Sequence, residues 1–181
     1  MSQITNRIDH VAWMCRPENH DAYVEKLSKL FNVTFEADDG GPDFGLRFTW
    51  SWSAGLEVLS PAGDGPHAQM CWKHLEAKGE GLFAVVMGVA NVGEAVERAR
   101  EMGYAPSPLM LLHGDLEEAY AKGGVPFDRE KEWMRRVQDC TECVLEHWLG
   151  GNLAIGRIVT DDPDRSAGGS QAEPSRVVPA E

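Results

Sequence analysis

The sequence predicts an α+β fold made of two βαβββ modules. Two observations lead to this fold class. A strand–helix–strand–strand–strand pattern runs from residue 8 to residue 61, and the same pattern recurs between residues 81 and 159. The apolar runs IDHVAWM at 8–14 and LFAVVMG at 82–88 align at an offset of 74 residues. This offset places the second helix within about a residue of where the first helix predicts it.

The first module opens with a β-rich apolar run at 8–15. Pro17 marks the start of a helix, because proline is favoured in the first turn, and an apolar stripe follows at helical spacing over Tyr23, Leu27, Leu30 and Phe31. The turn clusters DDGGPD and SAG then separate three short predicted strands, at 32–37, 46–52 and 55–61.

The second module repeats this order, beginning with an apolar strand at 81–89. Asn91, with Glu94 three residues later, predicts the N-cap of a helix, and Gly103 suits its C-terminal end. The module is completed by a broken strand at 104–112 and by a hairpin around the turn LGG, with strands at 142–148 and 152–159.

Two segments lie outside the repeated pattern. Residues 113–139 are a charged insertion, expected to be either a solvated surface helix or a lid that packs over a neighbouring opening. Residues 160–181 are poor in apolar side chains and rich in Pro, Gly and Ser, which predicts a disordered tail. We therefore expect one domain over 6–159, with modules at 6–62 and 80–159.

Composition narrows the class of function. The chain has 181 residues and a net charge of -12, which repels phosphate backbones and anionic lipid surfaces. We therefore expect neither a nucleic-acid partner nor a membrane partner. Charged, Gly or Pro residues interrupt every apolar run, and the N-terminus has no signal-peptide pattern, so a cytoplasmic location is expected.

The four cysteines, without an export signal, argue against a disulfide framework. A zinc site could be drawn from Cys140, Cys143 and His147, or from Cys71 with His74. However, the run CTECVLEHW lacks the Gly/Pro-rich knuckle usual for such pairs and is more typical of the approach to a strand. Buried or half-buried thiols are the preferred prediction.

Four short motifs stand in order on the predicted strands: IDHV at 8–11, GLEVLSP at 55–61, KGEGL at 78–82 and LGGNL at 149–153. They resemble the strand motifs of the vicinal-oxygen-chelate superfamily, which includes glyoxalase I, bleomycin-resistance proteins, extradiol dioxygenases and methylmalonyl-CoA epimerase. The resemblance implies two modules whose curved sheets share a concave cavity, and a homodimer.

The resemblance also implies a divalent-metal site with one ligand from each of four strands. It puts His10 and Glu57 at two of these positions, and their imidazole and carboxylate groups suit Mn, Fe, Co, Ni or Zn. Ala84 and Ile155 stand at the other two positions and cannot coordinate a cation. A further ligand would have to come from His113, Glu146 or His147. The sequence thus leaves two alternatives, a bound divalent metal or no cofactor.

Glu57 stands between two apolar residues of its strand, where an unpartnered carboxylate would cost several kcal/mol. His10 offers a partner, and such a pair could act as a coupled acid/base dyad without a metal. Trp50 and Trp52 share one face of their strand, and they would stack on a planar or apolar ligand if that face meets the cavity. They would be core residues if it meets the helices. Arg157 is a candidate for gripping an anionic ligand group, or an exposed residue at a strand end.

Two functions compete on these grounds. The first is a glyoxalase-like enzyme, an isomerase, epimerase or lyase that moves a proton next to a carbonyl of a small organic molecule, with His10 and Glu57 as base and acid. The second is a metal-free, bleomycin-resistance-like protein that sequesters an aromatic or apolar small molecule. Loss of the second-module ligands favours the binding protein. Retention of both His10 and Glu57 favours the enzyme, which is the function expected here.

Overall fold

The computed structural model describes residues 2–3, 5–35, 37–42, 44–111, 137–148 and 151–160. Its strands form one nine-stranded sheet. The strands are β1 (Ser2–Gln3), β2 (Arg7–Met14), β3 (Ala37–Gly41), β4 (Leu46–Ser51), β5 (Leu56–Pro61), β6 (Gly81–Gly88), β7 (Met110–Leu111), β8 (Val137–Trp148) and β9 (Gly151–Thr160). The helices in the described part of the chain are η1 (Pro17–Asn19), α1 (His20–Phe31), α2 (Pro66–Lys78) and α3 (Val92–Glu101).

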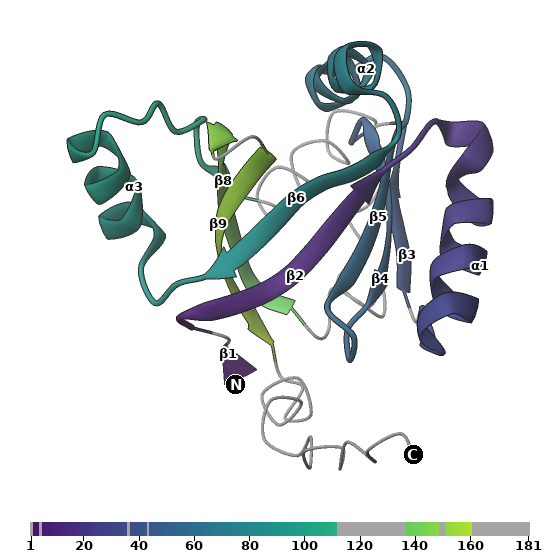
Figure 1. The fold of residues 1–181 in the computed structure, drawn as a ribbon, viewed down its shortest axis with the longest axis horizontal. Coiled ribbons are helices and arrows are strands. Elements are labelled where there is room, and N and C mark those ends of the chain that lie inside the picture. The colour runs from purple at the N-terminus through teal and green to yellow at the C-terminus, as the bar shows by residue number, and fades with distance from the viewer. Residues whose placement is uncertain are drawn as a thin grey trace, which may run out of the picture.

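The sheet consists of two halves with the same internal arrangement (Figure 1). The strand order is β3-β4-β5-β2 in the first half and β6-β9-β8-β7 in the second, and β1 pairs with β9. In each half the first strand of the chain is parallel to the last, β2 to β5 and β6 to β9, whereas the other neighbours are antiparallel. The predicted α+β class with duplicated βαβββ units is confirmed.

The two halves meet where β2 runs antiparallel to β6, and the register there shows which positions correspond. His10 pairs with Val86, and Ala12 pairs with Ala84. The offset of 74 residues that aligns the repeats relates His10 to Ala84 and Ala12 to Val86, so each of the two pairs is the counterpart of the other. Ala84 is therefore the counterpart of His10 in the second half.

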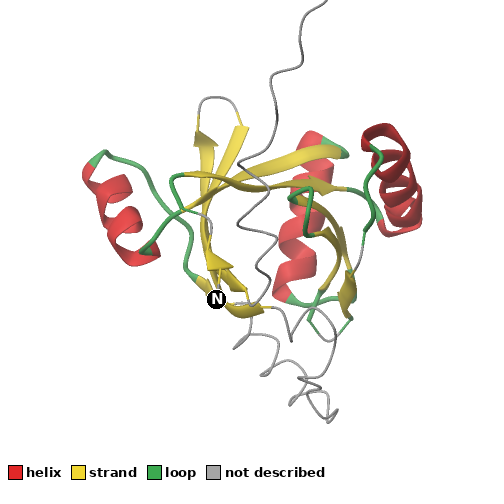
Figure 2. Ribbon diagram, turned by 90° about the horizontal axis from the view of Figure 1, so that it is seen from below, coloured by secondary structure: helices red, strands yellow, loops and turns green. Residues whose placement is uncertain are grey.

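The helices lie outside the curl of the sheet, with α3 on one side and with α1 and α2 on the other (Figure 2). α3 begins as predicted, because the Asn91 side chain accepts a hydrogen bond from the Glu94 amide at 3.1 Å and donates one to the Glu94 carboxylate at 3.1 Å. α2 was not predicted; it buries Ala68, Cys71 and Leu75. No helix in the part of the chain that the structure describes is both long and apolar enough to cross a membrane.

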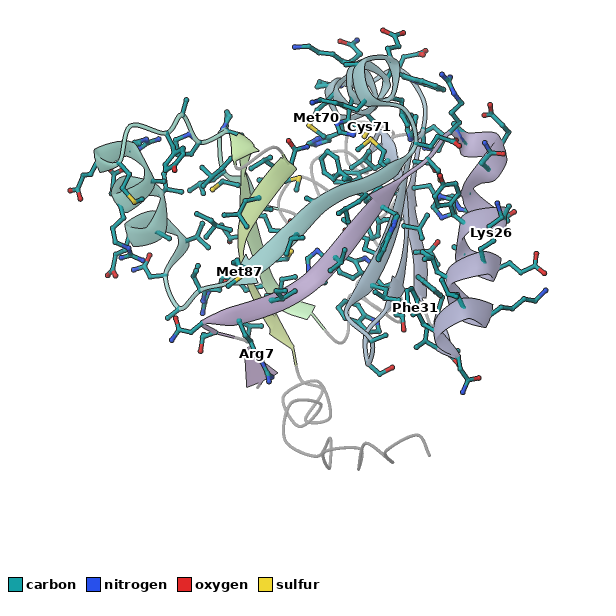
Figure 3. The ribbon with its side chains drawn as sticks, viewed as in Figure 1. Arg7, Lys26, Phe31, Met70, Cys71 and Met87 are labelled. Carbon is teal, nitrogen blue, oxygen red and sulfur yellow. The ribbon has the colours of Figure 1, made fainter. Side chains whose placement is uncertain are left out.

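α1 buries a shorter stripe than its sequence predicts. Leu27 packs against Cys15 and Val58, whereas Leu30 is 73% exposed and Phe31 is 51% exposed. Both exposed residues belong to the last turn of the helix, and Phe31 lies at its end in Figure 3. The predicted apolar stripe is thus correct for its first half only.

The predicted strand at 32–37 is wrong. Asn32 takes a left-handed conformation (φ 53°) that ends α1, and β3 begins only at Ala37, opposite Trp50. The segment expected to be a turn pairs with β4 instead, because backbone pairing with a neighbouring strand outweighs the β-propensity of the preceding apolar residues. β8 likewise starts at Val137, inside the predicted insertion. The rest of that insertion and the predicted tail beyond Thr160 lie outside the described residues.

All four cysteines are buried thiols, as predicted. Cys140 belongs to the apolar cluster that includes Trp50, whereas Cys143 packs with Val96 of α3. The two thiols of the C-x-x-C pair therefore serve different clusters, which argues against the zinc site that their spacing suggested.

Candidate active site

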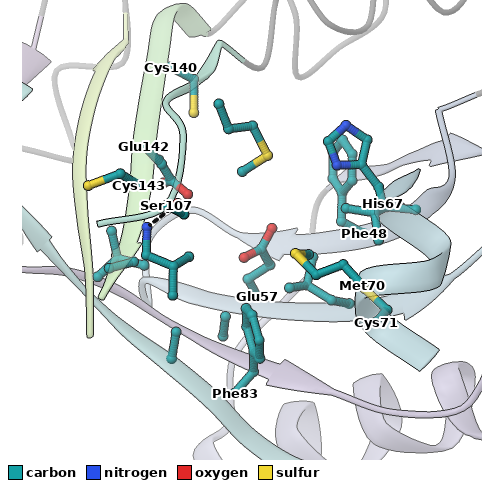
Figure 4. A pocket seen from close by; sticks show the side chains of 18 of the residues that line it. Phe48, Glu57, His67, Met70, Cys71, Phe83, Ser107, Cys140, Glu142 and Cys143 are labelled. Carbon is teal, nitrogen blue, oxygen red and sulfur yellow. Dashed lines mark hydrogen bonds between the residues drawn. The ribbon is translucent and has the colours of Figure 1, made fainter. Parts of the chain in front are cut away.

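A cavity of about 260 Å³ lies between the two halves of the sheet. Its walls are mostly apolar, and the larger side chains that form them include Phe44, Leu46, Phe48, Trp50, Leu59, Phe83, Val86 and Val144. α2 contributes His67, Met70 and Cys71, and the segment 107–110 lines the cavity as well. The carboxyl groups of Glu57 and Glu142 point into this space from different halves of the sheet (Figure 4).

His10 is the centre of the polar group in this cavity and is 1% exposed. Its Nδ1 lies 2.9 Å from Asp9 Oδ1, which fixes the ring and leaves Nε2 for the other carboxylates. Nε2 lies 3.5 Å from Glu57 Oε2 and 3.9 Å from Glu142 Oε1. The ring also meets Trp50 edge-on, with centroids 4.7 Å apart. One imidazole thus lies among three carboxylates.

An irregularity in β2 explains how the neighbours Asp9 and His10 can both be buried and bonded to each other. Successive side chains of a regular strand point to opposite faces. The pairing register with β6 shifts between Ile8 and His10, which is typical of a β-bulge and re-aims a side chain. Gly55 (φ +62°) passes close to this point, and a Cβ there would lie 2.8 Å from the Asp9 carbonyl oxygen.

The carboxylates decide the protonation state of His10. Burial alone would lower the pKa of this imidazole, because the charged form loses its hydration. Hydrogen bonds to Asp9 and Glu57 and the negative charge of Glu142 outweigh burial and raise the pKa from 6.5 to about 10. At neutral pH the ring is therefore an imidazolium.

The structure places the three predicted ligand-binding residues differently from one another. Trp50 lines the cavity. Trp52 stacks on Trp50, with centroids 5.0 Å apart, and is a buried core residue rather than part of the cavity lining. The guanidinium of Arg157 pairs with Asp139, and Arg157 is not among the described residues that line the cavity.

The strand register also corrects the position assigned to the fourth metal ligand. Ala12 pairs with Glu57 in the first half, and its counterpart Val86 pairs with Ala154 in the second. Ala154 is therefore the counterpart of Glu57 and lines the cavity. Ile155, which the motif alignment put there, packs in the apolar cluster of α3.

These placements test whether the cavity suits a resident metal. Of the four corresponding positions, His10 and Glu57 can coordinate, whereas Ala84 and Ala154 cannot. No group of three or more His, Cys, Asp or Glu side chains within the described ranges could hold a metal ion. The donor set therefore does not fit the four-ligand centre that the resemblance implied. The other candidates fall outside the description, His113 entirely and Glu146 and His147 in their side chains.

Glu142 is the site residue that sequence reasoning missed. It pairs across the strands with Gly156, where an added Cβ would lie 3.2 Å from Glu142 Oε1 and 2.9 Å from Val86 Cγ1. The bare backbone of β9 thus leaves room for the Glu142 carboxylate beside His10. The available signal was a glutamate opposite a glycine in a predicted hairpin.

No protein-family model matches this sequence, and no curated protein sequence matches it. Solved structures do match. A variant of the methylmalonyl-CoA epimerase of Streptomyces coelicolor, in complex with 2-nitronate-propionyl-CoA, is 18% identical with a TM-score of 0.52, over 84% of this chain and 96% of that chain. The Mycobacterium tuberculosis methylmalonyl-CoA epimerase is 11% identical with a TM-score of 0.52, over 86% of this chain and 90% of that chain. A hypothetical protein from Bacillus halodurans is 15% identical with a TM-score of 0.52, over 86% and 94%.

Identities this low show the fold alone. The matching chains are covered almost end to end, so the likeness extends over both halves of the sheet. It agrees with the four strand motifs and with the duplicated strand order. The chain has the vicinal-oxygen-chelate fold.

Proposed function

We propose that the protein is an isomerase- or epimerase-type enzyme that moves a proton next to the carbonyl group of a small organic molecule. The observation that carries this proposal is the buried His10, flanked by Asp9 and Glu57 in an otherwise apolar cavity. Placing ionised groups in an apolar wall costs free energy, and apolar side chains could fill the same space. Such clusters in a cavity are typical of functional sites.

The geometry supports a distinct task for each residue. Glu57 acts as the base that removes the proton from the carbon, because its carboxylate faces the cavity. The His10 imidazolium donates a hydrogen bond or a proton to the carbonyl oxygen, where negative charge develops as the C–H bond breaks. Asp9 positions the ring through Nδ1. These roles reverse the sequence-based expectation, in which His10 was the base and Glu57 the acid.

Deuterium exchange tests the proposal directly. Candidate substrates that carry an acidic C–H next to a carbonyl, beginning with methylmalonyl-CoA and small ketones, are incubated with the protein in D₂O and followed by NMR. Glu57→Gln should slow the exchange by about 10²–10⁴-fold, the usual contribution of a general base. Glu25→Gln, on the exposed face of α1, is the matched control and should exchange at the wild-type rate. Equal rates in wild type and Glu57→Gln would sink the proposal.

The apolar lining of the cavity supports one other function, the sequestration of an aromatic or apolar small molecule. The same experiment separates the two. A binding protein would take up an aromatic ligand equally well in wild type and in Glu57→Gln, without exchanging its protons.

Metal analysis of the purified protein adds an independent check, because the first-module pair His10 and Glu57 remains capable of coordination. His10→Ala and Glu57→Ala are the controls. We expect no near-stoichiometric metal that disappears in both variants. Near-stoichiometric metal that is lost in both variants would show that residues elsewhere in the chain complete the donor set.

A further inference from the structure

The lining of the cavity also indicates which substrates it admits, and this step rests on the proposed function. We propose that the substrate is a small, uncharged, apolar carbonyl compound, and that anionic compounds such as 2-oxo acids and CoA thioesters are excluded. Three features support this substrate class: the aromatic wall of the cavity, the charges around it and the rim of its opening.

One side of the cavity is a continuous aromatic surface. Phe44 meets Phe48 edge-on with centroids 6.1 Å apart, and Phe48 meets Trp50 in the same manner at 6.4 Å. Phe83 of β6 also lines the cavity. Rings arranged in this way favour an aromatic or aliphatic ligand, because such a ligand gains from leaving water and from edge-to-face contact.

The charges in the cavity disfavour an anion. No lysine or arginine occurs among the lining residues that the structure describes. The buried ring of His10 already contacts the carboxylates of Asp9 and Glu57. A carboxylate or phosphate group of a substrate would lose its hydration without gaining a new cationic partner, and it would lie beside the carboxylate of Glu57.

Two apolar side chains stand at the rim of the cavity. Met70 of α2 and Leu109 both line the cavity, yet they remain 44% and 47% exposed. Met70 lies beside Cys71 on the helix, as Figures 3 and 4 show. A cavity of about 260 Å³ holds only a small molecule, so a larger substrate would extend past these two side chains. These two side chains suit an apolar extension, and the lining residues that the structure describes include no lysine or arginine to meet the phosphates of a CoA group.

A matched pair of probes tests this inference. Phenylacetone and phenylpyruvate share a benzylic carbon next to a ketone. The other side of the ketone carries a methyl group in phenylacetone and a carboxylate in phenylpyruvate. We expect the full-length protein to bind phenylacetone at least tenfold more tightly than phenylpyruvate in isothermal titration calorimetry. Binding of phenylpyruvate or of methylmalonyl-CoA with equal or greater affinity would overturn the inference, and so would failure to bind phenylacetone.

Leu109→Glu gives a second measurement that does not disturb the buried groups. It should weaken phenylacetone binding several-fold, whereas Leu30→Glu, on the exposed end of α1, should leave it unchanged. Equal phenylacetone affinities in these two variants would show that Leu109 is not part of the binding site. Proton exchange is scored separately. Tight phenylacetone binding without exchange supports the inference and contradicts the proposed function. Exchange of methylmalonyl-CoA protons without exchange of phenylacetone protons supports the proposed function and contradicts the inference.

Discussion

Raising the pH should destabilise this protein through His10. The pKa of its ring is about 10 in the folded state and 6.5 in the reference state, so the folded chain holds the proton more tightly than the unfolded chain does. The resulting stabilisation is fully present below pH 6.5 and is lost as the pH rises toward 10. Each pH unit in this window removes roughly 1 kcal/mol, so that a few kcal/mol are lost in all. This loss approaches the lower end of the roughly 5–15 kcal/mol by which domains are stable.

Urea unfolding at pH 7 and pH 9 measures the effect, and we expect the free energy of unfolding to fall by roughly 2–3 kcal/mol between them. Cys15 and Cys71 set the highest pH at which this measurement reports on His10 alone. Burial raises the pKa of both thiols from 9.0 to about 12, so above pH 9 they add their own loss of stability. His10→Gln should lose most of the pH dependence, whereas the cavity-edge control His67→Gln should keep it.

His10→Gln leaves two buried carboxylates near an uncharged amide, and the variant could fail to fold for that reason. An NMR titration of the His10 ring in the wild-type protein avoids this difficulty. A midpoint below pH 7 would refute the reasoning, because it would mean that burial outweighs Asp9, Glu57 and Glu142. A flat stability profile between pH 7 and pH 9 would refute it equally.

Two further substitutions probe local geometry. Gly156→Ala should push the Glu142 carboxylate away from His10 and lower the His10 pKa measured by NMR. The control Gly93→Ala, whose Cβ would meet only the Asn91 side-chain oxygen at 3.4 Å, should leave that pKa unchanged. An unaltered pKa in Gly156→Ala would show that the Glu142 side chain can move and still keep its contact with His10. Asn91→Ala removes the side-chain cap of α3 and should lower the free energy of unfolding by about 1 kcal/mol in urea titrations; no change would mean that water replaces the cap at no cost.

Features that depend on local signals could be predicted from the sequence. The Asn91 cap and the hairpin of β8 and β9 follow from residues adjacent in the chain. β3 could not be located in this way, because its bounds depend on pairing with β4 across a turn. The sequence analysis did not predict α2, although Pro66 stands in its first turn.

The site was predictable to the extent that single motifs define it. His10 and Glu57 were found because each stands within a short strand motif, and the structure brings their side chains to 3.5 Å. Glu142 was missed because its place depends on Gly156 in another strand. Ile155 was misassigned by a single residue, and a slip of one residue along a strand moves a side chain to the opposite face of the sheet.

That one-residue difference can be tested by rebuilding the lost half of the ligand set. Ala84 and Ala154 are the counterparts of His10 and Glu57, and both line a cavity with room for larger side chains. The double variant Ala84→His, Ala154→Glu would present two imidazoles and two carboxylates to one point, a donor set that suits a divalent cation. We expect it to bind Co²⁺ with a visible absorption band that the wild-type protein lacks. The control Ala84→His, Ile155→Glu directs its carboxylate into the α3 cluster instead. Equal Co²⁺ affinity in the two double variants would mean that the pairing of β6 with β9 does not determine which side chain faces the cavity.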